Sequence, residues 1–149
     1  MKLVIQRVTE AQVSTGGETL SRIGAGMMVL VGIHTDDTVA DVEAMARKSA
    51  ALRIFDDADG VMNLSVTQTG GEILAVSQFT LLAQTRRGNR PSYIEAARPE
   101  KAEPLYELYC RRLGELTGQS VGRGRFGADM KVSLVNDGPV TIIMDTRAQ

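Results

Sequence analysis

The sequence predicts an α/β fold in which two sheet layers carry two main helices on one side. Short apolar segments, alternating or continuous, recur along most of the 149-residue chain, which is typical of strands. Two longer segments carry apolar residues at spacings of three and four, which is typical of amphipathic helices. Two helices cannot cover both faces of one sheet, so we expect two layers of mostly antiparallel or mixed strands. The length suits a single domain, residues 1–149.

The first half of the chain begins with strands. The segment 2–14 alternates well enough for a half-buried strand, and Gly16-Gly17 predicts a hairpin turn into the next strand. Residues 23–33 are almost continuously apolar and predict a central buried strand. The period then changes, and residues 36–53 predict an amphipathic helix with Asp or Thr available to cap its start.

The second half predicts the remaining strands and the second helix. After a turn at Asp59-Gly60 and a short strand, residues 72–83 predict another apolar strand, interrupted by polar side chains. The second helix is expected to begin at Arg98-Pro99 and to end at Gly118. Residues 121–135 and 139–145 predict two final strands, joined or interrupted at a Gly-Pro pair.

Composition indicates an ordinary globular chain and excludes several classes. The residues are 43% hydrophobic and 23% charged, with a net charge of −1. No apolar run approaches the roughly 20 residues of a membrane span, and no signal-peptide core is visible, so we expect no membrane partner. The single cysteine, Cys110, excludes an internal disulfide and suits a reducing cytoplasm. The single histidine, His34, argues against a multi-histidine metal site, so we expect neither metal nor cofactor.

Conventional catalytic constellations are weak here. A serine triad would have to combine His34 with Ser77, which lacks the Gly-x-Ser-x-Gly turn that exposes a nucleophile. The paired carboxylates at 36–37 and 56–57 suit turns and helix caps. Cys110 falls on or beside the apolar stripe that the second helix is expected to turn toward the core, and it is interpreted as a core residue.

Three segments rich in polar groups or glycine remain unexplained by packing alone. Ser77-Gln78-Phe79-Thr80 interrupts an apolar strand, and main-chain N–H groups at such a point can stabilise an oxyanion. Residues 136–139, Asn-Asp-Gly-Pro, offer bare carbonyls on a stiff surface, and X-Pro is the bond at which a cis peptide is least costly. Residues 124–130, GRFGADM, add an aromatic flanked by glycines. Each of the three also admits a purely structural interpretation.

Taken together, these segments resemble the bacterial D-aminoacyl-tRNA deacylases, also called the D-tyrosyl-tRNA deacylase family. The resemblance covers essentially the full length. Its diagnostic motifs are Ser-Gln-Phe-Thr, within VSQFTLLAQTRRGNRPSY at 76–93, and Asn-x-Gly-Pro-Val-Thr, within GRFGADMKVSLVNDGPVT at 124–141. The segments IQRV at 5–8, LRIFDD at 52–57 and MNLS at 62–65 also fit.

The resemblance implies a three-layer β/β/α fold and a homodimer with active sites at the subunit interface. It implies hydrolysis of the ester that joins a D-amino acid to the terminal ribose of tRNA, and activity on mischarged glycyl-tRNA. By this resemblance Gly138 and Pro139, joined by a cis bond, project into the partner's site and exclude L-amino acids by steric overlap.

The family also implies roles for individual residues. The catalytic pocket is expected to contain Ser77, Gln78, Phe79 and Thr80, with main-chain N–H groups near Phe79 and Thr80 as oxyanion donors. Further expected contributors are Arg7, which holds the Gly-Pro loop, and three residues that shape or support the site, namely Phe126, Met130 and Asn136. The candidates for contact with tRNA phosphates are Arg86, Arg87, Arg90 and Arg123.

Several alternatives stay open at the level of sequence. Either Thr80 acts as nucleophile, or the 2′-hydroxyl of the substrate activates water; the second is favoured because no base near Thr80 is identifiable. Phe126 and Met130 could be plain core residues, and Arg7 an ordinary surface-paired arginine. The chain as a whole could instead be a small-ester hydrolase or a dimeric tRNA-binding module without activity.

Overall fold

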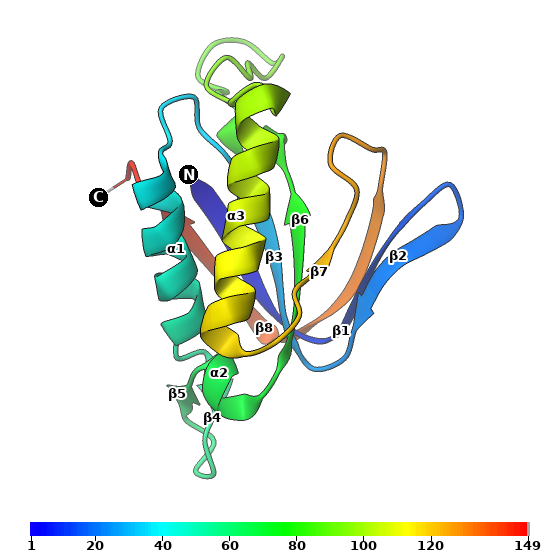
Figure 1. The fold of residues 1–149 in the computed structure, drawn as a ribbon, viewed down its shortest axis with the longest axis vertical. Coiled ribbons are helices and arrows are strands. Elements are labelled where there is room, and N and C mark those ends of the chain that lie inside the picture. The colour runs from blue at the N-terminus through cyan, green and yellow to red at the C-terminus, as the bar shows by residue number, and fades with distance from the viewer. Residues whose placement is uncertain (149) are drawn as a thin grey trace.

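The computed structural model describes residues 1–148 and consists of one curved mixed sheet, a small hairpin and helices packed on one side (Figure 1). The six-stranded sheet has the order β2-β1-β3-β6-β7, with β8 paired to the free side of β1. Its strands are β1 (Lys2–Thr15), β2 (Glu18–Ile23), β3 (Gly26–Gly32), β6 (Glu72–Ser77), β7 (Gly122–Arg123) and β8 (Lys131–Asp145). The predicted mixed α/β class is therefore confirmed.

The strand pairing explains where the helices lie. β1 runs antiparallel to β2, β3 and β8, whereas β3 and β6, and then β6 and β7, are parallel. Parallel neighbours need a crossover connection. The crossovers contain α1 (Val39–Ala51) and α3 (Pro99–Thr117), which lie side by side over the same face of the sheet (Figure 1). The first crossover also holds the hairpin of β4 (Phe55–Asp56) and β5 (Met62–Leu64) and the short helix α2 (Val66–Thr69).

Two hydrophobic clusters define the layers. The larger lies between the helices and the sheet and includes Leu3, Val29 and Ile73 from strands with Tyr109 and Leu113 from α3. The smaller lies on the other face of β3 and β6, where their side chains meet those of β1 and β2; its buried members are Val8, Ala11, Val13, Ile23, Met28, Leu74 and Val76. The curved sheet thus supplies both β layers of a β/β/α arrangement.

A buried ion pair fixes the N-terminus to the start of the helical layer. The ammonium group of Met1 lies 2.6 Å from Oδ1 of Asp37, and neither side chain is exposed. Asp37 also accepts a hydrogen bond from the His34 main-chain N–H and lies 3.1 Å from the Arg147 guanidinium. One carboxylate therefore joins the first residue, the loop before α1 and the segment that follows β8.

Two expected strands are shorter than predicted. The strand expected over 72–83 ends at Ser77 and is followed by a 3-10 helix, η1 (Phe79–Leu82). Leu82 packs over Gly32, where an added Cβ would lie 2.5 Å from the leucine side chain, so long-range packing favours the turn. The strand expected over 121–135 is also wrong for 124–130, which form a loop between β7 and β8.

Candidate functional site

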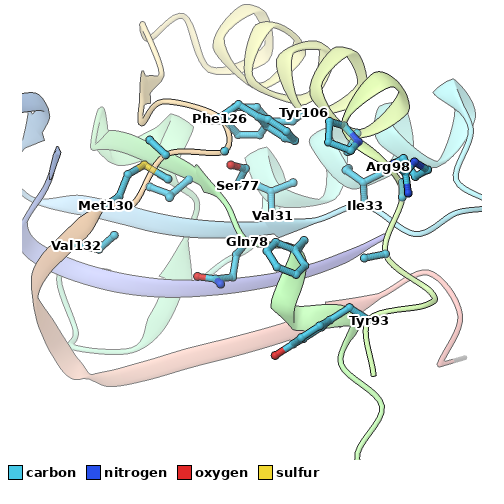
Figure 2. A pocket seen from close by; sticks show the side chains of 18 residues that line it. Val31, Ile33, Ser77, Gln78, Tyr93, Arg98, Tyr106, Phe126, Met130 and Val132 are labelled. Atoms are coloured by element: carbon cyan, nitrogen blue, oxygen red, sulfur yellow. The ribbon is translucent and has the colours of Figure 1, made fainter. Parts of the chain in front are cut away.

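A cavity of about 530 Å³ opens where β3 and β6 end, beneath the N-terminal half of α3. The carboxyl ends of parallel strands meet here, which is where α/β sheets commonly bind ligands. Loops 93–98 and 126–130 complete its walls (Figure 2). The lining residues are Val31, Ile33, Val76, Ser77, Gln78, Phe79, Tyr93, Ala96, Ala97, Arg98, Pro99, Ala102, Tyr106, Phe126, Gly127, Ala128, Met130 and Val132.

The turn from β6 into η1 brings the Ser-Gln-Phe-Thr segment to this cavity. Ser77, Gln78 and Phe79 line it, and Figure 2 shows Ser77 between Phe126 and Gln78. The Gln78 N–H donates to the Val31 carbonyl at 2.8 Å, which anchors the turn to β3. The Gln78 side-chain amide donates to the hydroxyl of Thr80, which is not a lining residue.

Main-chain donors are left available at this turn. The first N–H groups of a helix have no partner within it. Within residues 1–148, the N–H groups of Phe79 and Thr80 make no hydrogen bond to another main-chain or side-chain group. Two adjacent N–H groups, one of them on the lining residue Phe79, therefore have no acceptor among the described residues.

The cavity wall carries no conventional general base. Among its described lining residues, the only titratable side chains are Arg98 and two tyrosines. The hydroxyl of Tyr106 donates to the Ala75 carbonyl at 2.6 Å, and burial raises the pKa of Tyr106 far above its usual value. That phenol stays neutral and occupied, so it cannot accept a proton at neutral pH.

Aromatic and thioether side chains shape the two sides of the cavity. Phe126 packs against Tyr106 with ring centroids 6.2 Å apart, and Met130 lies beyond it on the same side (Figure 2). At the mouth, Phe79 and Tyr93 meet edge to face, with centroids 5.1 Å apart. Both mouth residues are exposed, at 57% and 40%. The site thus offers an aromatic rim beside an apolar interior.

The Gly-Pro loop is a bulge in β8 that stands opposite Arg7. Gln6 pairs with Thr141 and Val8 with Asn136, so residues 137–140 lie opposite Arg7 alone. The Gly138-Pro139 bond is cis, and Gly138 has a φ of +130°. Neither residue lines the cavity of its own chain, and both are exposed to solvent.

Two side chains fix the base of this loop. Arg7, only 9% exposed, donates from Nε to the Asp137 carbonyl at 3.1 Å. Asn136 accepts from the Val140 N–H and donates to the Thr141 hydroxyl, each at 3.1 Å. The two residues hold the loop from opposite ends.

The four arginines expected at tRNA lie in two different settings. Arg86, Arg87 and Arg90 occupy the exposed loop between η1 and Tyr93, at the end of the molecule where α3 begins (Figure 1). Arg123 is bound within the chain instead: its Nε donates to Glu107 at 3.0 Å and its Nη1 donates to the Val121 carbonyl at 2.9 Å. The first group has the freer guanidinium groups.

Other candidates from the sequence lie outside the cavity. The Nδ1 of His34 accepts the Asp36 N–H at 3.0 Å, and His34 is not a lining residue. Cys110 is buried in the core under α3, and burial raises its pKa to about 11. Within the described chain, no His, Cys, Asp and Glu side chains are grouped so as to hold a metal ion. Over the same residues no helix has both the length and the apolar character needed to cross a membrane.

The sequence did not single out three lining residues, Tyr93, Arg98 and Tyr106. Tyr106 lies on the buried face of α3, and a residue can belong both to that face and to a cavity wall. Tyr93 and Arg98 come from a loop whose path is fixed by contacts with β3: the Ala97 N–H donates to the Ile33 carbonyl at 2.9 Å. The only local signal for Tyr93 was its position just after the arginine-rich loop, the loop that carries Arg86, Arg87 and Arg90.

Comparison with known proteins gives matches over almost the whole chain. The family model described as D-Tyr-tRNA(Tyr) deacylase matches residues 4–145. A protein of Porphyromonas gingivalis named D-aminoacyl-tRNA deacylase is 60% identical over 146 residues, covering 98% of this chain and 97% of that protein. One of the same name from Akkermansia muciniphila is 58% identical over 147 residues, covering 99% and 98%.

Two solved structures have the same fold as this chain. A structure titled c-Myc DNA Unwinding Element Binding Protein is 43% identical, with a TM-score of 0.92 over 99% of this chain and 100% of that one. A probable eukaryotic D-amino acid tRNA deacylase, 16% identical, has a TM-score of 0.83 over 96% and 97% and supports the fold alone. On the family match and the two bacterial relatives, this chain belongs to the D-Tyr-tRNA(Tyr) deacylase family.

Proposed function

We propose that this protein hydrolyses the ester bond of D-aminoacyl-tRNA, releasing the D-amino acid and free tRNA. Membership of the deacylase family over nearly the whole chain supports the reaction class. The observation that carries the proposal is the pair of unpartnered N–H groups at Phe79 and Thr80, beside a cavity that contains Ser77 and Gln78. Donors of this kind stabilise the oxyanion that forms when water attacks an ester.

The water is activated by the 2′-hydroxyl of the terminal ribose in this proposal. A Thr80 nucleophile would need a neighbouring base, and the only side-chain partner of its hydroxyl among the described residues is the Gln78 amide. The vicinal hydroxyl of the substrate lies next to the ester in every aminoacyl-tRNA, so it supplies the missing polar group. The route uses neither a metal ion nor a cofactor.

The Gly138-Pro139 loop gives the reaction its stereospecificity by entering the site of a second subunit. The loop lies outside the cavity of its own chain and is exposed, as expected of a part that acts elsewhere. The strand that carries it also exposes Val135 and Ile143, at 49% and 68%, which suits an apolar contact with a second copy. A homodimer with sites at the subunit interface would satisfy both features.

The handedness filter works by exclusion. An L-amino acid directs its side chain toward a position where a D-amino acid has only hydrogen, and a rigid main-chain bulge there overlaps the L side chain. A clash of about 3 kcal/mol corresponds to a discrimination of roughly a hundredfold. Glycine has no side chain to clash, so mischarged glycyl-tRNA is also a substrate under this proposal.

The tRNA partner is met by the loop that carries Arg86, Arg87 and Arg90. This loop leads directly from η1 to Tyr93, and Phe79 and Tyr93, at its two ends, both line the cavity. Arginine is well suited to phosphate because its fork of N–H donors matches the phosphate oxygens. Arg123 is a weaker candidate because it is already paired with Glu107. Charged tRNA is a cytoplasmic substrate, so we place the activity there.

A single assay tests the proposal. Purified protein is incubated with D-Tyr-tRNA, L-Tyr-tRNA, Gly-tRNA and a free D-Tyr ester, and the deacylation of each is measured. We expect rapid release from D-Tyr-tRNA and Gly-tRNA, with L-Tyr-tRNA at least about a hundredfold slower. Hydrolysis of the free ester alone would indicate a small-ester hydrolase, and tRNA binding without release would indicate a binding module. Either result would overturn the proposal.

A further inference from the structure

The guanidinium group of Arg7 joins two segments that lie far apart in the sequence, residues 54–56 and residue 137. Its Nη1 donates to the Ile54 carbonyl at 2.9 Å and to Oδ1 of Asp56 at 3.2 Å, at the start of the β4–β5 hairpin. Its Nε donates to the Asp137 carbonyl at 3.1 Å and lies 3.4 Å from the Asp137 carboxylate. The hairpin and the Gly-Pro bulge are thus connected through one side chain.

The geometry of this junction allows the β4–β5 hairpin to affect the position of the Gly-Pro loop. A guanidinium is planar and rigid, so fixing one of its nitrogens fixes the direction of the others. The Arg7 side chain is only 11% exposed, which leaves it little freedom once Nη1 is bound. A Cβ added at Gly138 would lie 3.2 Å from Nη2 of Arg7, so the guanidinium also limits how far the bulge can move inward.

The charges at the junction also favour a role for Asp56. Arg7 is positively charged, and a largely buried charge needs counter-charges. Two carboxylates supply them, Asp56 from the hairpin and Asp137 from the bulge. If Asp56 were absent, Asp137 alone would balance the charge of Arg7, and Nη1 would keep only its hydrogen bond to the Ile54 carbonyl.

We propose that Asp56 is a positioning residue for stereospecificity: it holds Arg7 in the orientation that fixes the Gly138-Pro139 loop. Asp56 touches neither the cavity nor the loop and acts through Arg7 alone. The inference rests on the proposed function in one respect, that the loop discriminates between D and L substrates. The effect of Asp56 on loop order does not depend on that function and can be measured without substrate.

The test compares D56A with D56E and with a matched control, D59A. Asp59 lies in the same hairpin, and within the described chain its carboxylate makes no hydrogen bond or ion pair. Asp56 is half exposed, at 52% of its side chain, so we expect a moderate effect, on the order of three- to tenfold. D56E keeps the charge and should restore most of the wild-type behaviour.

Two readouts decide the outcome. The first is hydrogen exchange of the Val140 amide, which donates to Asn136 inside the bulge. The second is the ratio of kcat/KM for D-Tyr-tRNA to that for L-Tyr-tRNA. We expect D56A to speed the exchange and to lower the ratio, each about three- to tenfold, mainly by raising the rate on the L substrate. D59A should change neither readout.

Contrary outcomes are distinguishable. Unchanged exchange and an unchanged ratio in D56A would overturn the inference, as would a parallel fall of both rates with unchanged exchange. If wild-type protein does not distinguish D from L substrates, the proposed function fails. The exchange measurement would then still decide whether Asp56 orders the loop.

Discussion

Phe79 and Tyr93 meet edge to face at the mouth of the cavity, with their ring planes at 74°. One comes from the helix that follows β6 and the other from the far end of the arginine-rich loop. Exposed aromatic rings beside a basic loop are suited to stacking on an unpaired base, a common way to bind the single-stranded end of an RNA. The terminal adenosine of tRNA is such an end.

The variant Phe79→Ala therefore tests whether the aromatic rim stacks on a base of the tRNA. Stacking on an aromatic side chain is worth about 1–3 kcal/mol per base, so KM for D-Tyr-tRNA should rise roughly tenfold or more while kcat changes little. The main-chain N–H of residue 79 is retained in this variant. Ile94→Ala is the matched control, because Ile94 is 81% exposed but does not line the cavity. A fall in kcat with KM unchanged would argue against a stacking role.

The sequence predicted the regular parts of the fold well because their signals are local. The helix expected over 36–53 appears as Val39–Ala51, and the one expected over 98–118 as Pro99–Thr117. Hydrophobic period, capping residues and stop signals are all contained within such a segment. The same holds for the hairpin turn at Gly16-Gly17, where both glycines have positive φ.

The failures occur where distant segments decide the conformation. Phe79, Leu81 and Leu82 continue an apolar run that local pattern assigns to a strand. Leu82 instead packs against Gly32, a contact that no local pattern reveals. The same limit applies to the site. Sequence indicated Ser77 and Phe126, but Tyr93 and Arg98 reach the cavity only because their loop is bound to the end of β3.

Thr80→Ala separates the two catalytic routes. If the 2′-hydroxyl of the substrate activates water, the variant should retain D-Tyr-tRNA hydrolysis within about tenfold of wild type, since it loses only a hydrogen bond with Gln78. A substrate with a 2′-deoxy terminal adenosine should be hydrolysed at least about a hundredfold more slowly, the usual range for loss of an acid–base group. Single-turnover rates on both substrates provide the measurement. Complete loss of turnover in Thr80→Ala with tRNA binding intact would support the nucleophile instead.

Cys110 should behave as a core residue whose ionisation opposes folding. Burial raises its pKa from 9.0 in an unstructured chain to about 11, so the folded state favours the neutral thiol. This contribution to stability is fully present below pH 9 and is lost as the pH rises from about 9 to 11. Urea unfolding across this range should show a smaller alkaline loss for Cys110→Ala than for wild type.

The same burial predicts slow chemical labelling of Cys110. At pH 8, iodoacetamide should react with the native protein at least about a hundredfold more slowly than with the urea-unfolded chain, because the thiolate is scarce and inaccessible in the folded state. Labelling of the native protein as fast as that of the unfolded chain would show that the thiol is not buried. Mass spectrometry of timed samples gives both rates.

Asp37→Asn should be strongly destabilising. The substitution removes the negative charge that balances the buried Met1 ammonium and the nearby Arg147. Breaking one side of a buried ion pair costs about 3–5 kcal/mol, because the remaining charge stays uncompensated. Asp36→Asn is the matched control: its side chain is 76% exposed, and we expect a change of at most about 0.5 kcal/mol. Equal midpoints in urea for the two variants would contradict the assigned role.

Gly138→Ala tests the loop that we propose as the handedness filter. Gly138 has a φ of +130°, and a methyl group there would lie 2.8 Å from Cγ2 of Val140, so the bulge must shift to accept it. In the proposed arrangement, a shift of even a few tenths of an ångström would change the space left beside the α-carbon of the substrate. We expect hydrolysis of L-Tyr-tRNA to rise about tenfold or more relative to D-Tyr-tRNA.

The control for this variant is Gly16→Ala. Gly16 also has a positive φ, +55°, but a Cβ there would meet nothing within 4 Å, and the residue lies in the hairpin turn between β1 and β2. It should lose about 1 kcal/mol of stability and keep the wild-type ratio of D to L hydrolysis. If Gly138→Ala also keeps that ratio while remaining folded, the loop does not set the handedness. The discrimination would then have to arise within the walls of the cavity itself, where Met130 and Phe126 are the first side chains to vary.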